Sequence, residues 1–120
     1  IGGQLIPYFD NDNTSKPMLV LIHGFGANKE NWLTIAPQLT ADYHLIAPDL
    51  LGHGQSDKPM DGDYSVLSQA QRVHDLLAQL NIHQPAHIVG SSMGGLIAGL
   101  FCRQLSTKHA IADVNEHRRR

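Results

Sequence analysis

A serine lies at the centre of a glycine-rich segment whose spacing could build a nucleophile. The segment reads Gly90-Ser91-Ser92-Met93-Gly94-Gly95 and follows a short apolar run at residues 86–89. Glycine lies two positions before and two positions after Ser92, which is the Gly-x-Ser-x-Gly pattern of a sharp strand-to-helix turn. Side chains at the flanking positions would collide, and the strained turn lifts the serine hydroxyl clear of the sheet. Ser91 has Val89 two positions before it, so the pattern selects Ser92 as the candidate nucleophile.

A second glycine-rich segment could supply hydrogen-bond donors to the same place. His23-Gly24-Phe25-Gly26 follows the continuous apolar run 18–22, which is typical of a strand buried on both faces. Parallel strands end at one edge of a sheet, so the loops after residues 22 and 90 are expected to meet there. The backbone N–H groups of Phe25 and Met93 could then form an oxyanion hole.

The elements that must hold these two loops alternate along the chain. We expect strands at residues 4–9, 18–22, 44–47 and 86–89. Helices are expected after Asn28 and Ser65, which can cap their first turns, and after the serine turn. The helix after Asn28 should carry one apolar side made of Trp32, Ile35, Ala36 and Leu39. This alternation predicts an α/β fold with a mostly parallel sheet and helices on both faces.

Three segments together resemble the alpha/beta-hydrolase superfamily. They are residues 23–26, 48–59 and 90–95, and they occur in the family's order and at its spacing. The stretch 23–32 is most similar to bacterial lipases and monoacylglycerol lipase-type esterases. The resemblance covers residues 4–101 and implies the N-terminal part of an alpha/beta-hydrolase fold, truncated after the nucleophile-elbow helix. Residues 1–101 would form a partial hydrolase domain, and residues 102–120 would be a tail outside the family.

The resemblance also implies roles for individual residues. Ser92 would be the nucleophile of a lipase-like serine hydrolase of carboxylic esters that forms an acyl-enzyme, with Phe25 and Met93 as the oxyanion hole. His23 would support the oxyanion loop, and Asp49 would shape its own loop rather than act in catalysis. Relatives with aspartate at the nucleophile position, such as haloalkane dehalogenases and epoxide hydrolases, are disfavoured because a serine stands there. The remaining structural positions of the motifs are Gly24, Gly26, Gly52, Gly54, Gly90, Gly94 and Gly95.

The base and the acid that would activate Ser92 are missing from the expected places. The family order is Ser, then Asp or Glu, then His, and the family's acid and histidine follow later strands. The candidates after Ser92 are confined to the tail: Asp113, Glu116, His109 and His117. We therefore expect that the triad acid and histidine are absent from this chain and that the strand before the elbow has an unpaired edge. The chain alone is expected to be marginally stable and inactive.

The tail itself suggests a shifted reading frame. The hypothesis is that the coding sequence gained one base just after the codon of Phe101. Restoring the frame with synonymous codons allows Ala-Ala-Ser-Tyr-Pro-Gln-Asn-Met-Arg-Ser-Leu-Met-Leu-Met-Asn-Thr-Gly-Gly, which is similar to the family's helix end and next core strand. Codons around Phe101 that are incompatible with this reading would refute the hypothesis.

Composition narrows the classes of partner. The formal net charge is −2, which gives no case for nucleic acid, and no apolar run approaches the roughly 20 residues of a membrane span. Cys102 is the single cysteine, so an internal disulfide is excluded.

No metal or cofactor is expected, because Pro85 between His83 and His87 argues against a helical metal pair. The expected partner is a small-molecule ester or lipid, and the sequence assigns neither a compartment nor an oligomeric state. Because the chain begins with Ile1 rather than methionine, we expect a fragment or a processed product.

Two other functions remain open at this point. Carbon–carbon bond hydrolases and perhydrolases of the same fold share these motifs, and the cap region after the next strand would distinguish them. A non-catalytic ligand-binding protein could use the same scaffold, although it need not keep a strained serine turn. Covalent labelling by a fluorophosphonate separates the two classes, because an enzyme is labelled and a pure binder is not.

Overall fold

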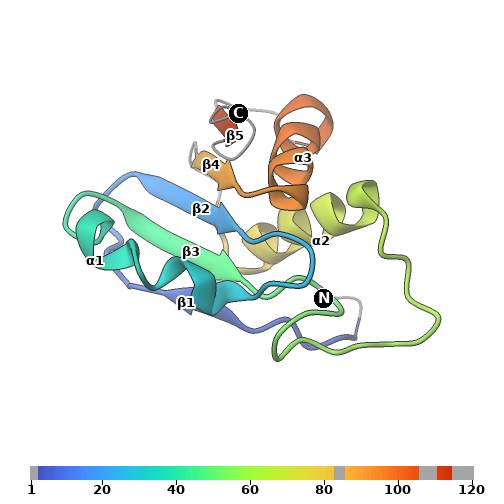
Figure 1. Ribbon diagram of the computed structural model, residues 1–120. Helices are drawn as coiled ribbons and strands as arrows, with labels where there is room; N and C mark the ends of the chain where they lie inside the picture. The colour runs from blue at the N-terminus through green and yellow to red at the C-terminus, as the bar shows by residue number, and fades with distance from the viewer. Residues whose placement is uncertain (1–2, 83–85, 106–110, 115–120) are drawn as a thin grey trace.

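The computed structural model describes residues 3–82, 86–105 and 111–114, and its centre is a five-stranded sheet (Figure 1). The strands lie in the order β1-β3-β2-β4-β5. β1 runs antiparallel to β3, and the other neighbouring pairs are parallel. The strand bounds are β1 Tyr8–Asp10, β2 Met18–Ile22, β3 His44–Pro48, β4 Ala86–Gly90 and β5 Ile111–Val114. The prediction of a mostly parallel α/β sheet is confirmed.

The register between β2 and β4 brings the two candidate loops to the same level. Met18 lies opposite Ala86 and Ile22 lies opposite Gly90, so both strands end together. All five residues of β2 are buried, as a strand in the middle of a sheet covered on both faces should be. The chain therefore leaves β2 into His23 and leaves β4 into Ser91 at one edge of the sheet.

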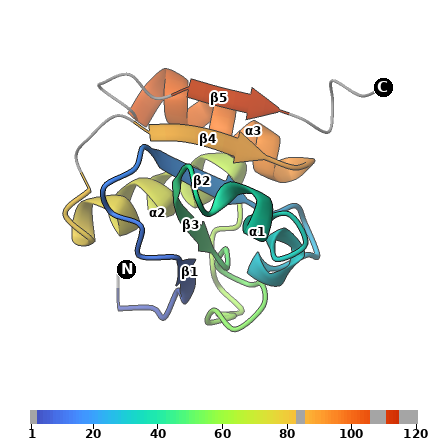
Figure 2. The ribbon, with the colours of Figure 1, turned by 90° about the vertical axis from the view of Figure 1, so that its left-hand side faces the viewer.

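Two helices cover one face of the sheet (Figure 2). They are α2, Val66–Gln79, and α3, Met93–Leu100, which continues as a π-helical turn, η2, Phe101–Leu105. The side chains of Val20, Ile22 and Ile88 pack on this face in one cluster with buried residues of both helices. Ser65 caps α2 as expected, because its Oγ accepts a hydrogen bond from the Ser68 N–H at 3.2 Å.

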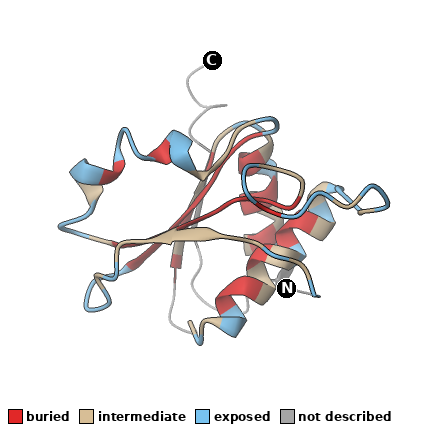
Figure 3. Cartoon of the chain, turned by 90° about the horizontal axis from the view of Figure 1, so that it is seen from below, coloured by how far each residue is buried: buried red, intermediate tan, exposed pale blue. Residues whose placement is uncertain are grey.

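The other face carries two short helical segments. η1, Lys29–Trp32, is a 3-10 turn, and α1, Ala36–Leu39, follows it. Trp32 and Ala36 pack against Leu19 and Leu21, which alternate along β2 with the residues of the opposite face. Figure 3 shows the buried strands between partly exposed helical layers. Helices on both faces are thus present, as the alternation predicted.

Three local expectations were wrong. The first strand begins at Tyr8 rather than at residue 4. The helix expected after Asn28 is split into η1 and α1, which turns Ile35 outward with 37% of its surface exposed. The strand before the elbow is not an unpaired edge, because β5 pairs with β4 in parallel from His87↔Ile111 to Gly90↔Val114.

Among the described residues, every helix is too short or too polar to cross a bilayer.

Candidate active site at the carboxyl edge of the sheet

Ser92 occupies a strained turn between β4 and α3. Its φ is 58° and its ψ is −120°, a backbone conformation that a residue with a Cβ rarely adopts. The turn closes through two backbone hydrogen bonds, from the Gly94 N–H to the Ser91 oxygen and from the Gly95 N–H to the Ser92 oxygen, both at 2.9 Å. The sequence pattern therefore predicted both the position of the turn and the residue that bears its strain.

The glycines on either side of Ser92 are required by close backbone approaches. A Cβ on Gly90 would overlap the carbonyl of Gly94. A Cβ on Gly94 would overlap the carbonyl oxygens of Ile22 and His23 at the end of β2. The first contact belongs to the turn itself, whereas the second lets α3 begin directly against the neighbouring strand.

The loop after β2 packs against the serine turn. The Ser91 N–H donates to the Ile22 oxygen at 3.1 Å, which continues the pairing of the two strands into the loops. A Cβ on Gly24 would lie 3.0 Å from the Ser91 oxygen and 3.2 Å from the Ser92 Cβ, so a larger residue here would push against the serine turn. The two loops predicted to meet are therefore in contact.

His23 holds the first loop with both of its ring nitrogens. Nε2 accepts a hydrogen bond from the Leu50 N–H at 3.0 Å, and Nδ1 lies 2.7 Å from the Gly24 oxygen. Because a backbone N–H can only donate, Nε2 carries the lone pair and Nδ1 carries the proton that it donates to Gly24. Burial lowers the pKa of His23 below its ordinary value, which keeps this neutral tautomer in place.

The same contact orients the next peptide group. The Gly24 carbonyl and the Phe25 N–H belong to one planar trans peptide, so they point in opposite directions. Fixing the carbonyl toward His23 therefore fixes the direction of the Phe25 N–H. The Ala27 N–H also donates to the Gly24 oxygen at 3.1 Å, and Gly26 completes the turn with a φ of 77°.

Two hollows of about 420 Å³ each open beside this turn. Ser92 lines one of them and Met93 lines the other, and Phe25 lines both. Each volume lies within the range of small-molecule sites. The candidate nucleophile and the two candidate oxyanion donors are thus residues that line these two hollows.

A sequence model of the alpha/beta hydrolase fold matches residues 17–113. The chain belongs to the alpha/beta hydrolase family. Lipase 3 of Moraxella sp. (strain TA144) is 48% identical over 96 residues, which make up 80% of this chain and 30% of that protein. Monoacylglycerol lipase ABHD6 of Mus musculus is 34% identical over 87 residues, which make up 72% of this chain and 26% of that protein. The crystal structure of a membrane phospholipase A superposes with a TM-score of 0.80 at 44% identity, over 83% of this chain and 32% of that one.

This alpha/beta hydrolase chain spans about a third or less of the length of these relatives. The relatives confirm the resemblance that the motifs indicated, including the similarity to lipases.

Asp49 connects the loop of residues 50–58 to the start of η1. Its side chain is fully buried and accepts hydrogen bonds from the backbone N–H groups of Lys29, at 2.7 Å, and Gln55, at 3.0 Å. The Lys29 ammonium lies 2.9 Å from the second carboxylate oxygen. Burial alone would raise the pKa of Asp49, but the hydrogen bonds from Gln55 and Lys29 hold it below its ordinary value. Gly54 leaves the space that this carboxylate needs, since a Cβ there would lie 2.5 Å from it.

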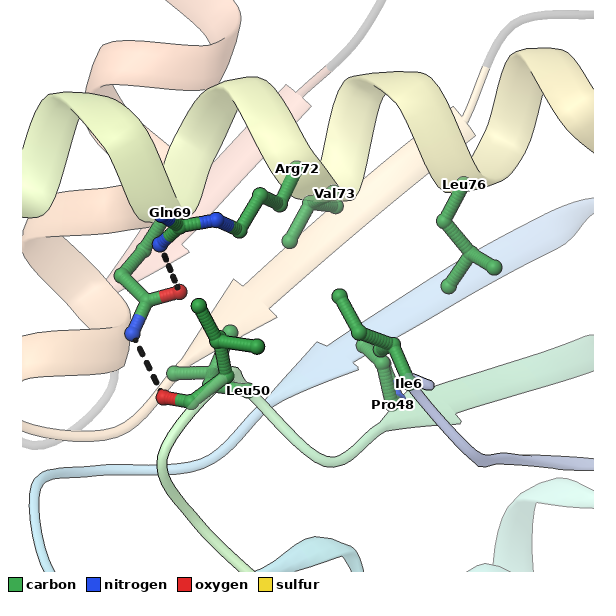
Figure 4. Close-up of a pocket in the computed structure, with 8 residues that line it drawn as sticks. Ile6, Pro48, Leu50, Gln69, Arg72, Val73 and Leu76 are labelled. Atoms are coloured by element: carbon green, nitrogen blue, oxygen red, sulfur yellow. Dashed lines mark hydrogen bonds between the residues drawn. The ribbon is translucent and has the colours of Figure 1, made fainter. Parts of the chain in front are cut away.

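Gln69 is a positioning residue that the sequence did not reveal (Figure 4). It is buried on α2, where its Nε2 donates to the Leu51 oxygen at 2.9 Å and its Oε1 accepts from Arg72 at 3.1 Å. A small cavity of about 10 Å³ lies beside it, between α2 and the end of β3. The hydrogen bond fixes the loop that carries Gly52, whose φ of 85° favours glycine. The amphipathic pattern of α2 identifies the apolar face of the helix, and a single polar residue on that face belongs to no motif. The role of Gln69 could therefore not be predicted from the sequence.

The other predicted residues are distributed as follows. Asp113 lies on β5 opposite Val89, and His109, Glu116 and His117 lie outside the described residues. Within the described ranges, no group of three or more His, Cys, Asp or Glu side chains could hold a metal ion. The structure brings together Ser92, Phe25 and Met93, and His23 holds the loop that carries Phe25.

Proposed function

We propose that this chain carries the nucleophile and the oxyanion hole of a lipase-like serine hydrolase that acts on carboxylic esters. The observation that carries the proposal is the φ of 58° at Ser92, in a turn built of glycines between β4 and α3. A serine held in a strained conformation at a ligand-binding edge is typical of a functional site rather than of packing. The lipases among the relatives favour an ester or a lipid as substrate.

In the proposed reaction, the Ser92 Oγ attacks the ester carbonyl while its proton passes to a general base. The carbonyl oxygen becomes an oxyanion that accepts hydrogen bonds from the N–H groups of Phe25 and Met93. Met93 is the first residue of α3, so its N–H lacks an acceptor within the helix and adds the positive end of the helix dipole. The alcohol leaves with a proton from the base, and water then hydrolyses the acyl-enzyme.

His23 is not the base in this scheme. Its Nδ1 proton is donated to Gly24 and its Nε2 lone pair is used by the Leu50 N–H, so neither nitrogen can take a proton from Ser92 without breaking the loop. The general base and the acid that orients it are expected outside the residues of this chain.

A chimera tests the proposal directly. Residues of Lipase 3 from Moraxella sp. that correspond to this chain are replaced by this chain's residues, and hydrolysis of nitrophenyl esters is measured. We expect an active chimera in which Ser92→Ala lowers kcat by on the order of 10⁶-fold. The matched control is Ser91→Ala, which removes the neighbouring hydroxyl and should retain most of the activity. A folded chimera that remains equally active after Ser92→Ala contradicts the proposal.

A further inference from the structure

The loop that carries the candidate oxyanion donor Phe25 is exposed at its middle. The Phe25 side chain is 81% exposed, and its ring meets that of His53 edge-on, with centroids 5.7 Å apart. Gly26 follows with a φ of 77°, and a Cβ built on it would meet nothing within 4 Å. The direction of the Phe25 N–H therefore depends on the residues that anchor the loop before and after it. His23 is the anchor before it, through the hydrogen bond that its Nε2 accepts from the Leu50 N–H.

Lys29 anchors the other end of this loop. Its backbone N–H donates to the Asp49 Oδ1 at 2.7 Å, and its ammonium donates to the Oδ2 of the same carboxylate at 2.9 Å. Asp49 comes directly after β3, and its side chain is fully buried. The main chain and the side chain of Lys29 thus both bind one fixed group, which sets the position and the direction of the chain at this residue.

The Lys29 ammonium has an acceptor for each of its three hydrogens. Besides Asp49, it lies 3.2 Å from the Gln55 Oε1 and 3.0 Å from the Glu30 Oε2. Burial opposes the charge, but the hydrogen bonds to Asp49 and Glu30 raise the pKa of Lys29 above its ordinary value. An apolar side chain at this position would make none of these contacts, although the backbone N–H of residue 29 could keep its own.

The two anchors end on consecutive residues, since His23 binds the Leu50 N–H and Lys29 binds the Asp49 side chain. The segment between them is therefore closed at both ends on the end of β3. We propose that Lys29 is a positioning residue for the oxyanion hole, because it holds the second end of this segment and so fixes the direction of the Phe25 N–H. This inference rests on the proposed ester hydrolysis and adds a residue that the proposed reaction does not use.

The expected effect of such a residue falls on the chemical step. An ester oxygen gains most from the Phe25 N–H once it has become an oxyanion, so a misdirected N–H slows the reaction more than it weakens substrate binding. A residue that only stabilises the fold would instead change the fraction of folded protein and leave each folded site as active as before.

Lys29→Met in the Lipase 3 chimera tests the proposal, because methionine removes the ammonium and leaves the backbone N–H. Fluorophosphonate labelling taken to completion counts the folded sites, and the kinetic constants are expressed per site. We expect kcat for a nitrophenyl ester to fall by about 10- to 100-fold while KM changes by less than about twofold. Lys29→Arg keeps a cation and its donors and should recover much of kcat. The matched control is Lys16→Met, at an exposed lysine before the start of β2, which should leave both constants unchanged.

A trifluoromethyl ketone provides the second measurement, because its carbonyl carbon adds the serine oxygen and its carbonyl oxygen becomes an oxyanion. In Lys29→Met we expect its inhibition constant to rise by the same factor by which kcat/KM falls. An unchanged kcat, or a fall in kcat without a rise in this inhibition constant, overturns the inference. Failure of the proposed function is distinct, because it appears as full activity in the Ser92→Ala chimera. A chimera that needs Ser92 but tolerates Lys29→Met refutes the role of Lys29 alone.

Discussion

At the scale of single residues, the site depends on close contacts between backbone segments. Ser92 is one of three non-glycine residues with positive φ among those described, and the other two are Asp12 and Asn81. Asp and Asn adopt this region readily because their short polar side chains bond locally, whereas serine at this position costs on the order of 1–3 kcal/mol. The surrounding contacts of α3 with the end of β2 must hold that strain.

Two glycines of α3 give a matched test of this close packing. Gly94→Ala drives a Cβ into the carbonyl oxygens of Ile22 and His23, so we expect a loss of about 1–3 kcal/mol or more in unfolding free energy. Gly99 lies in the same helix with nothing within 4 Å of a Cβ, so Gly99→Ala should stabilise by about 0.5–1 kcal/mol. Urea unfolding of both variants measures the difference. Equal effects at the two positions would show that the approach of α3 to β2 is not tight.

Some residues of the candidate site could be predicted from the sequence, and others could not. Ser92, Phe25 and Met93 follow strand ends within short motifs, so their placement depends on local spacing alone. Gln69 and Lys29 act through partners that are 18 and 20 positions away, Leu51 and Asp49. No local pattern encodes such pairs, because each joins two segments that are far apart in the sequence.

At the scale of elements, the loops after β2 and β3 form hydrogen bonds with one another. His23 joins the first loop to Leu50 after β3, and Asp49 joins that same segment to η1. The orientation of the Phe25 N–H therefore depends on β3 and on the loop that follows it.

The ion pair between Asp49 and Lys29 predicts how stability depends on pH. The pKa of Asp49 is lowered on folding, so its contribution is fully present above its ordinary value and is lost as the pH falls through the folded value. Asp49→Asn removes the buried partner of the Lys29 ammonium, which keeps its pair with the exposed Glu30 carboxylate at 3.0 Å, and we expect a loss of about 1–3 kcal/mol at neutral pH. The difference between wild type and variant in urea unfolding should shrink below about pH 4.

Asp75→Asn is the control for this experiment. Its pair with His74 is exposed on both sides, so the variant should change stability by at most about 1 kcal/mol. Asp49→Asn would contradict the proposed fastening if it behaved like this surface variant, or if its effect did not depend on pH.

The elements also show where sequence patterns stop being informative. The runs at residues 18–22 and 44–47 predicted β2 and β3 closely, because continuous burial leaves a clear apolar signal. The pairing of β5 with β4 was not predicted, since residues 102–120 were expected to lie outside the family, whereas the family model matches residues 17–113. The shifted reading frame of residues 102–120 stays a proposal, for which the nucleotide sequence around Phe101 is the test.

At the scale of the whole molecule, the described chain holds the serine turn and the oxyanion loop of the proposed catalytic apparatus. The sheet gathers a strained serine, two backbone donors and two hollows at a single edge. A serine hydroxyl is nevertheless a weak nucleophile until a base removes its proton. The histidine nearest in the chain to the oxyanion loop, His23, has both nitrogens committed to that loop.

We therefore expect the 120-residue chain alone to hydrolyse short nitrophenyl esters no faster than its Ser92→Ala variant. A fluorophosphonate should likewise label the chain no faster than that variant, because it too needs an activated hydroxyl. The same reagent should label Ser92 rapidly in the Lipase 3 chimera, where a base and an acid are supplied by the rest of the fold. Turnover by the chain alone that disappears with Ser92→Ala would mean that a base lies within these residues. His53, which lines the same hollow as Phe25 and Met93, would then be the first position to substitute.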